Sequence, residues 1–157
     1  MKTKLISIVC VFALLLALTA CGGTGSQAQK SAAEIADAIY SSQTFQDTLH
    51  AIDTDMIGDY YRIDSADLSD AKVYVSGSFS TAEEIAVFQA SSSDAVEKIK
   101  KAIDIRLEDL KLAFENYVPG EMTKINDPVL VTKGNTVVLV LADDTASVSD
   151  QVDELLK

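Results

Sequence analysis

The chain has 157 residues, of which 13 are lysine or arginine and 24 are aspartate or glutamate, so its formal net charge is −11 at pH 7. A surface of this sign repels the phosphates of nucleic acids and of anionic lipid headgroups, and we expect neither as a partner. Hydrophobic residues make up 48% of the chain, which is typical of a globular protein and excludes a disordered one.

The first twenty residues have the pattern of a secretory signal peptide. Lys2 and Lys4 precede an apolar run from Leu5 to Leu18, and two small residues follow. The run is shorter than the roughly 18 to 20 apolar residues of a membrane-spanning helix, so it favours a cleaved signal over a transmembrane anchor. We therefore predict a signal peptide over residues 1–20.

Cys21 follows this signal directly. The stretch Leu18-Thr19-Ala20-Cys21 resembles the lipobox of bacterial lipoproteins, in which the cysteine thiol receives a diacylglyceryl group and cleavage makes that cysteine the new amino terminus. The resemblance implies lipidation of Cys21 and a lipid-anchored location on the extracytoplasmic face of the cell membrane. The alternative is an ordinary secretory signal followed by an incidental cysteine.

Cleavage before Cys21 would leave one cysteine, and therefore no internal disulfide. It would remove two lysines and no acid, leaving 11 basic and 24 acidic residues and a net charge of −13. Residues 22–30 are rich in glycine, serine and glutamine, which predicts a flexible tether with a reach of roughly 15–18 Å. Residues 21–30 would then consist of the lipidated cysteine and this tether. Residues 31–157 are then a single domain.

The domain is predicted to begin with helices. Ser31-Ala32-Ala33-Glu34 has the spacing of a capping box and opens a helix that carries Ile35, Ala38 and Ile39 on one face. A second helical stretch carries Phe45, Leu49 and Ile52. A short helix from Met56 to Tyr61 breaks at residues 62–64.

Two strands follow. The stretch from Ala71 to Phe79 alternates, with Val73 and Val75 on one face, and predicts a strand from Lys72. Residues 84–90 are interpreted as a strand paired with it. Possible caps at residues 80–84 leave a short helix as the alternative.

The longest helix is predicted from Asp94 to Tyr117. Its apolar residues form one stripe at helical spacing. These residues are Val96, Ile99, Ile103, Leu107, Leu110, Phe114 and Tyr117. Asp94 can cap the amino end, and Pro119-Gly120 is expected to end the helix.

A hairpin and a last helix complete the chain. Residues 128–132 and 136–141 are the predicted strands, with Gly134 supplying the positive φ of a tight turn. The run from Val137 to Leu141 suggests a central strand buried on both faces. Asp143 or Asp144 opens a helix whose apolar residues are Val148, Val152, Leu155 and Leu156.

Together these elements predict an α+β domain. Its mainly antiparallel four-stranded sheet has the order β-β-α-β-β-α along the chain, with the long helix packed on one face. One or two amino-terminal helices precede it. They either cover the other face or leave it partly open as a contact surface.

The sequence contains no recognisable metal or cofactor site. His50 is the only histidine, a zinc site of the usual kind needs several ligands, and no G-x-S-x-G elbow is present. We interpret His50 as a surface residue.

One stretch is partly similar to a calcium loop. Asp53, Asp55, Gly58 and Asp64 match its first, third, sixth and twelfth positions. Ile57, however, occupies the fifth position, where an oxygen ligand is required. We interpret these acids as caps and solvated side chains, and expect no metal and no cofactor.

Two sets of residues are candidate sites. Asp143 and Asp144 follow a buried strand, where a carboxylate pair could act, although both could equally cap the last helix. Tyrosines Tyr60, Tyr61 and Tyr74 offer contact area and a hydroxyl for partner binding, and Gly77 would let a partner's backbone approach. The alternative is that these four residues are half-buried parts of the sheet and helices.

Several motifs resemble the bacterial lipoproteins grouped as the domain of unknown function 4358. They are Tyr61-Arg62-Ile63-Asp64, "YVSGSFSTAEEIAVFQA" and "FENYVPGEMTKINDPVLVTKGNTVVLVLADD", within a similarity over roughly residues 31 to 155. The resemblance implies a glycine after the tyrosine of the first motif, where this chain has Arg62. It implies a short lipoprotein of a Gram-positive anaerobe and transfers no catalytic residue.

We therefore expect a lipid-anchored extracytoplasmic lipoprotein that acts as a non-catalytic binding or accessory module. Its partner would be an envelope protein, a peptide or a glycan, with no nucleic acid. One alternative is an envelope hydrolase that uses Asp143 and Asp144. The other is a structural spacer that associates with itself.

Overall fold

The computed structural model describes residues 29–78 and 80–157. The predicted signal peptide, Cys21 and most of the predicted tether lie outside the described residues. The described chain is an α+β fold built on one antiparallel sheet in the order β1-β2-β3-β5-β4. The strands are β1 (Leu49–Ala51), β2 (Leu68–Ser76), β3 (Glu84–Ala90), β4 (Val129–Lys133) and β5 (Thr136–Leu141).

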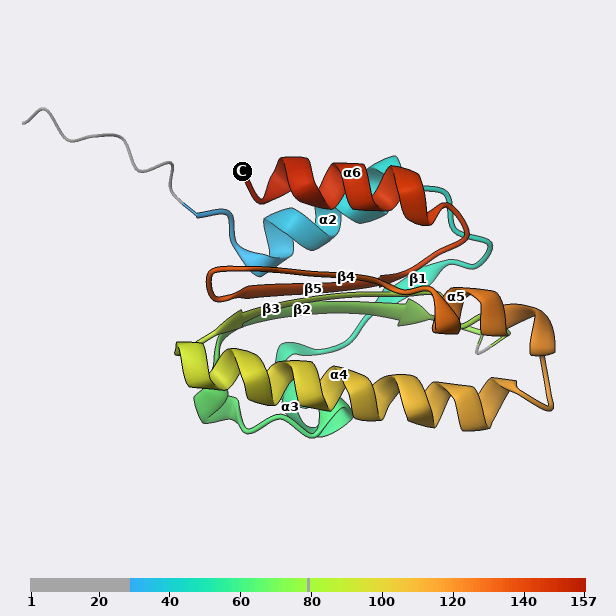
Figure 1. The fold of residues 1–157 in the computed structure, drawn as a ribbon, viewed down its shortest axis with the longest axis horizontal. Helices are drawn as coiled ribbons and strands as arrows, with labels where there is room; N and C mark the ends of the chain where they lie inside the picture. Colours follow the sequence, from blue (N-terminus) through green and yellow to red (C-terminus); the bar gives the residue numbers. More distant parts are fainter. Residues whose placement is uncertain (1–28, 79) are drawn as a thin grey trace, which may run out of the picture.

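Helices cover both faces of the sheet (Figure 1). One face packs against α2 (Ala32–Ser42) and α6 (Thr145–Leu155). The other packs against α3 (Ile57–Tyr61), α4 (Ser93–Phe114) and α5 (Met122–Asn126). Short 3-10 helices precede three elements: η1 (Thr54–Met56), η2 (Ser65–Asp67) and η3 (Pro119–Glu121). Of the two alternatives for the second face, the covered one is therefore correct and the partly open one is wrong, because α2 and α6 bury that face.

The central strands were predicted correctly. β3 spans Glu84–Ala90 and β5 spans Thr136–Leu141, and every residue of β5 is buried. The β4–β5 turn has Gly134 at φ +57°, the positive value that the tight turn requires. Ser31 forms the predicted capping box of α2, and Asp144 accepts a hydrogen bond from the Ser147 amide as the N-cap of α6.

The sheet has five strands instead of four because β1 replaces the predicted second helix. The spacing of Phe45 and Leu49 suits a helix, but the intervening amides of Gln46 and Asp47 donate to the buried carboxylate of Glu83. These hydrogen bonds hold the backbone out of a helix. Leu49 then continues as a strand beside Ser76 of β2.

β2 begins at Leu68, four residues before the predicted start. The register between β2 and β3 shifts between Leu68 and Asp70, and this bulge interrupts the alternation on which the sequence prediction depended. The sequence prediction also missed α5, which is only five residues long.

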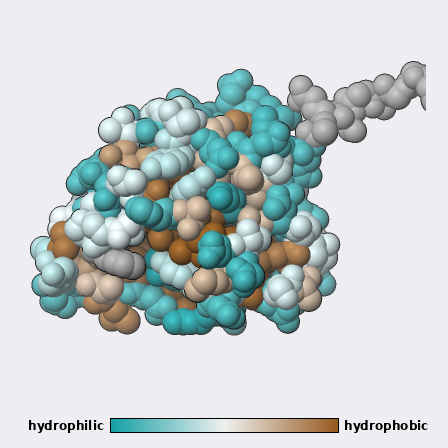
Figure 2. Space-filling view, turned by 180° about the vertical axis from the view of Figure 1, so that it is seen from behind, coloured by the Kyte–Doolittle hydropathy of each residue, from teal (hydrophilic) through white to brown (hydrophobic). Residues whose placement is uncertain are grey.

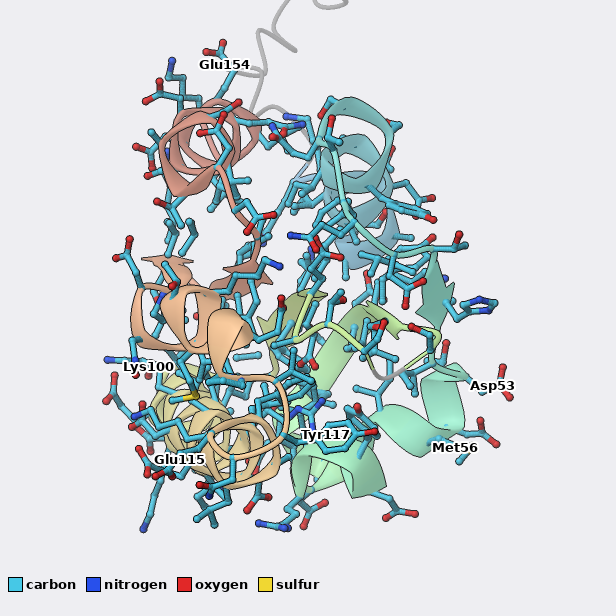
Figure 3. All side chains as sticks on the ribbon, turned by 90° about the vertical axis from the view of Figure 1, so that its right-hand side faces the viewer. Asp53, Met56, Lys100, Glu115, Tyr117 and Glu154 are labelled. Atoms are coloured by element: carbon cyan, nitrogen blue, oxygen red, sulfur yellow. The ribbon has the colours of Figure 1, made fainter. Side chains whose placement is uncertain are left out.

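The long helix α4 is shorter than predicted. Its N-cap is Ser92, whose side chain accepts from the Ala95 amide, instead of Asp94. It ends at Phe114, before Pro119-Gly120, because the chain then turns and Val118 packs against the core in place of Tyr117. Tyr117 is 83% exposed and lies on the surface (Figure 3).

Among the described residues, no helix combines the length and the apolar character that crossing a membrane would require.

Candidate partner-binding site

Part of strand β2 has no neighbour on its outer side. β1 pairs only with Tyr74, Val75 and Ser76, and beyond it the Ile52 amide donates to the Val73 carbonyl at 3.0 Å. On the other side, β3 pairs with β2 from Leu68 to Val75. Residues 68–72 are therefore an edge of the sheet within the described chain.

The outward-facing backbone groups of this edge can be assigned. Alternate residues of an antiparallel strand direct their N–H and C=O toward opposite neighbours. The Val73 carbonyl faces β1, whereas the Ser76 amide donates to Glu83 just before β3. By this alternation, the N–H and C=O of Ala71 face away from β3. They are groups with which an added strand could pair.

A groove of about 520 Å³ runs beside this edge. One wall is β2 itself, and the other is the segment that includes η1, α3 and η2, where Thr54, Asp55, Gly58 and Asp59 line the groove. Ile63, Leu68 and Ala71 contribute apolar surface. Figure 2 views the molecule from the side that carries β1, α3 and this edge, and shows apolar side chains gathered between hydrophilic ones.

The turn after α3 shapes the second wall. The Ile63 amide donates to the Gly58 carbonyl at 2.8 Å, and a Cβ on Gly58 would lie 2.9 Å from the Ile63 carbonyl oxygen. Arg62 is left-handed, with φ 56° and ψ 40°, at the carboxyl end of α3. This turn reverses the chain so that Asp59 and Asp64 both line the groove.

The charged residues lining the groove are all acidic: Asp55, Asp59, Asp64 and Asp70. Asp64 accepts from the Ala66 amide, and Asp70 accepts from the Ala32 amide at 2.7 Å. Asp55 and Asp59 are exposed and have no side-chain hydrogen bond or ion pair within the described part of the chain. They are available to a cationic group. Asp53 and Met56 point into solvent on the same side of the molecule (Figure 3).

The predicted tyrosine corner is mostly internal. Tyr61 is 2% exposed and donates a hydrogen bond to the buried carboxylate of Glu84. Arg106 binds the same carboxylate, with its Nη2 2.6 Å from Glu84 Oε2 and 2.6 Å from the Tyr60 hydroxyl. Burial, together with the charge of Glu84, raises the pKa of Tyr61 well above its ordinary value. Tyr61 is therefore a residue of the hydrophobic core. Tyr60 is half-buried, and the Arg106 guanidinium lies over its ring.

Tyr74 and Gly77 also contact other residues of the same chain. The Tyr74 hydroxyl donates to Asp37 at 2.6 Å, its ring packs on Tyr40, and burial with this hydrogen bond raises its pKa to about 12. A Cβ on Gly77 would overlap the imidazole of His50. The space beside Gly77 is therefore filled by the His50 side chain of the same chain and not by a partner's backbone.

Asp143 and Asp144 have separate partners. Asp144 caps α6, whereas Asp143 accepts from Gln46 Nε2 at 2.7 Å and lies 3.3 Å from Lys124 Nζ. Lys124 is 2% exposed and also contacts Glu121 at 2.9 Å. Burial alone would lower the pKa of Lys124, but the hydrogen bonds and charge of Glu121 outweigh it and raise that pKa.

The sequence analysis missed this cluster around Lys124, and with it Glu83. Glu83 is 1% exposed, lies 3.8 Å from Lys124 Nζ and accepts from the Gln46 and Asp47 amides and the Thr81 hydroxyl. These bonds connect the loop before β1, the start of β3 and helix α5. In residues 29–78 and 80–157, histidine, cysteine, aspartate and glutamate form no group of three that could hold a metal ion.

A family model described as "Domain of unknown function (DUF4358)" matches residues 41–142, well over half of the chain. The chain belongs to the DUF4358 family. No curated protein and no solved structure matches it. The DUF4358 match runs from the end of α2 to just past β5, and includes the β2 edge and both walls of the groove. Arg62 stands where the resemblance implied a glycine, and it adopts the left-handed conformation that glycine adopts most readily.

Proposed function

We propose that this DUF4358 protein is a lipid-anchored extracytoplasmic lipoprotein, attached through Cys21, that acts as a non-catalytic binding or accessory module at the cell envelope. The observation that carries the binding role is the unpaired edge of β2 beside a groove of about 520 Å³. Binding sites for small molecules have volumes of about 300–1,000 Å³, and this groove falls within that range. The signal and lipobox pattern of residues 1–21 supports the location.

The use of the buried ionisable groups supports a non-catalytic role. Glu84 is shared by Arg106 and Tyr61, and Glu83 binds backbone amides near Lys124. In both networks the polar atoms are hydrogen-bonded to the chain itself, and buried side-chain polar atoms without a partner are absent from the described residues. Such networks fix a structure.

Labelling in cells tests the lipid anchor. The full chain is expressed in a bacterium that processes lipoproteins, with an alkynyl fatty acid in the medium, and the membranes are then washed with carbonate. We expect label on the wild-type chain and none on a Cys21→Ala variant, which should leave the membrane fraction. Equal membrane retention of an unlabelled Cys21→Ala chain would contradict the anchor.

Site-specific cross-linking tests the binding role. A photoreactive benzoylphenylalanine replaces Ser69, which lines the groove, or Thr132, which is exposed on β4. Irradiation of intact cells should give a discrete adduct from position 69 that is absent from position 132. The same products from both positions would argue against a specific site at this groove.

Self-association is the second candidate function, because β4 is also an edge of the sheet. Pairing of two β4 strands would join two copies into one continuous sheet, as a structural spacer requires. The predicted net charge of −13 opposes such contact between copies. Light scattering on the chain from Gly22 to Lys157 should therefore report a monomer, and a stable dimer would favour the spacer.

A further inference from the structure

We infer that the groove beside β2 takes an extended peptide segment with basic side chains, which adds to the sheet as a strand along residues 68–72. This inference rests on the proposed function and names the chemical class of the partner. Strand addition to a sheet edge is a common mode of peptide recognition, in which main-chain hydrogen bonds supply affinity and alternate side chains supply specificity.

The backbone of the edge sets the length of the added strand. Residues 68–72 extend about 17 Å at roughly 3.3 Å per residue, and the pairing of Ala51 with Tyr74 stops a new strand at the other end. Ala71 presents an outward N–H and C=O. A backbone hydrogen bond formed there replaces one made to water and adds little net free energy, so backbone pairing alone gives weak binding.

The charges on the groove walls determine which charge the side chains of a bound peptide should carry. Asp55 and Asp59 are exposed, and among the described residues no lysine, arginine or histidine lines the groove. The side chain of Ala71 faces the core under α3 and α4, on the same face of the sheet as the wall that carries these acids. Every second side chain of an added strand points to this face. A segment with lysine or arginine at alternate positions therefore fits.

The second edge of the sheet is a matched control. In the part of the chain that the structure describes, β4 pairs only with β5, but the hollow beside it is lined by a single acid, Asp127, together with apolar and hydroxyl side chains. Lys133 and Thr136 close the two-residue β4–β5 turn, so by alternation Thr132 directs its N–H outward, as Ala71 does on β2. The two edges share backbone chemistry and differ in charge.

Synthetic peptides of opposite charge provide the test. The full chain is placed in nanodiscs of zwitterionic lipid, and empty nanodiscs serve as the blank. The probes are fluorescein-labelled peptides of alternating lysine and valine, their glutamate–valine counterpart, and a lysine–valine peptide with N-methylated backbone amides. Fluorescence anisotropy gives the affinity. We expect the lysine–valine peptide to bind about tenfold or more tightly than either of the other two.

Variants then locate the site. Asp55→Asn with Asp59→Asn should weaken lysine–valine binding about tenfold at about 50 mM salt, and less at higher salt, because screening reduces the contribution of exposed charges. The matched pair Asp150→Asn with Asp153→Asn, on exposed positions of α6, should change it by less than about twofold.

Proline variants test the strand pairing itself. Ala71→Pro removes the outward N–H and should weaken binding about tenfold, whereas Thr132→Pro on the other edge should leave it unchanged within about twofold. If Ala71→Pro does not fold, as judged by its thermal melt, the N-methylated peptide still tests backbone pairing on the wild-type chain.

Three results would overturn the inference. The N-methylated peptide could bind as well as its parent, which would mean that charge alone attracts it. Thr132→Pro could reduce binding as much as Ala71→Pro, which would place the peptide elsewhere. No peptide could bind at all, and the acids and the bulge of β2 would then only protect the edge from unwanted pairing. A specific Ser69 adduct in cells would in that case preserve the proposed function with a different class of partner.

Discussion

Replacing Lys124 by methionine tests whether the buried cluster at the start of β3 holds the fold together. The ammonium group of Lys124 is 2.9 Å from Glu121, 3.3 Å from Asp143 and 3.8 Å from Glu83. Methionine keeps a similar apolar volume and removes the charge. The Glu121 and Glu83 carboxylates would then be buried without a cation.

The expected loss of stability depends on the hydrogen bonds that these carboxylates retain in the Lys124→Met variant. Breaking a buried ion pair by removing one partner costs about 3–5 kcal/mol. Glu83 retains the Gln46 and Asp47 amides, and Glu121 retains the Ala82 amide. We therefore expect the free energy of unfolding to fall by about 3 kcal/mol, the lower end of this range. This loss corresponds to a fall in Tm of about 10 °C for a domain of this size.

Urea and thermal unfolding of the chain from Gly22 to Lys157 measure this loss. The control is Lys111→Met, which removes a partly exposed lysine 2.7 Å from the exposed carboxylate of Glu108 and should cost less than about 0.5 kcal/mol. Because the pKa of Lys124 is raised in the folded state, its contribution is complete below the ordinary value of 10.5 and disappears as the pH rises through the folded value. Equal, small losses for the two variants would refute the reasoning.

Three further substitutions test individual contacts by thermal unfolding. Tyr61→Phe removes the hydrogen bond to the buried Glu84 carboxylate and should cost about 1.5–3 kcal/mol. Asp47→Asn should destabilise the chain at neutral pH, because hydrogen bonds from serine side chains hold the pKa of Asp47 well below its ordinary value of 3.8. That difference should persist above about pH 4 and vanish as the pH falls toward the depressed pKa. Gly77→Ala should lower the Tm by forcing the imidazole of His50 out of its place.

Matched variants separate these effects from those of substitution in general. Tyr117→Phe changes the same hydroxyl on an 83% exposed ring, and should leave the Tm unchanged. Gly120→Ala adds a methyl group where no atom lies within 4 Å. A loss from Tyr117→Phe as large as that from Tyr61→Phe would contradict the role of the Tyr61 hydrogen bond. A loss from Gly120→Ala as large as that from Gly77→Ala would contradict the overlap with His50 as the cause.

The elements that could be predicted are those whose local pattern agrees with their final environment. The apolar stripe from Val96 to Phe114 is compatible only with a helix, and the apolar run of β5 was interpreted as a buried strand. Both predictions are confirmed. The spacing of Phe45 and Leu49 is compatible with a helix. It is equally compatible with a loop that leads into a strand. The choice between them depends on Glu83, which is distant in the sequence and binds the intervening amides.

The groove could not be predicted because it is a property of the sheet and not of any one segment. It exists because β1 is only three residues long and leaves the first part of β2 unpaired. Asp55 was visible only as an acid in a turn, and Asp59 lay unremarked within the predicted short helix from Met56 to Tyr61. Tyr60 and Tyr61 were visible as a pair, but a dipeptide does not reveal which ring points inward.

One signal of the buried clusters was nevertheless present in the sequence. Glu83 and Glu84 are adjacent at the start of an apolar strand, and adjacent residues of a strand point to opposite faces of the sheet. Because this sheet is covered on both faces, both carboxylates are buried. Arg106 on α4 is 2.6 Å from Glu84, and Lys124 on α5, which packs against the same face as α4, is 3.8 Å from Glu83 just before β3. These two ion pairs link the start of β3 to both α4 and α5.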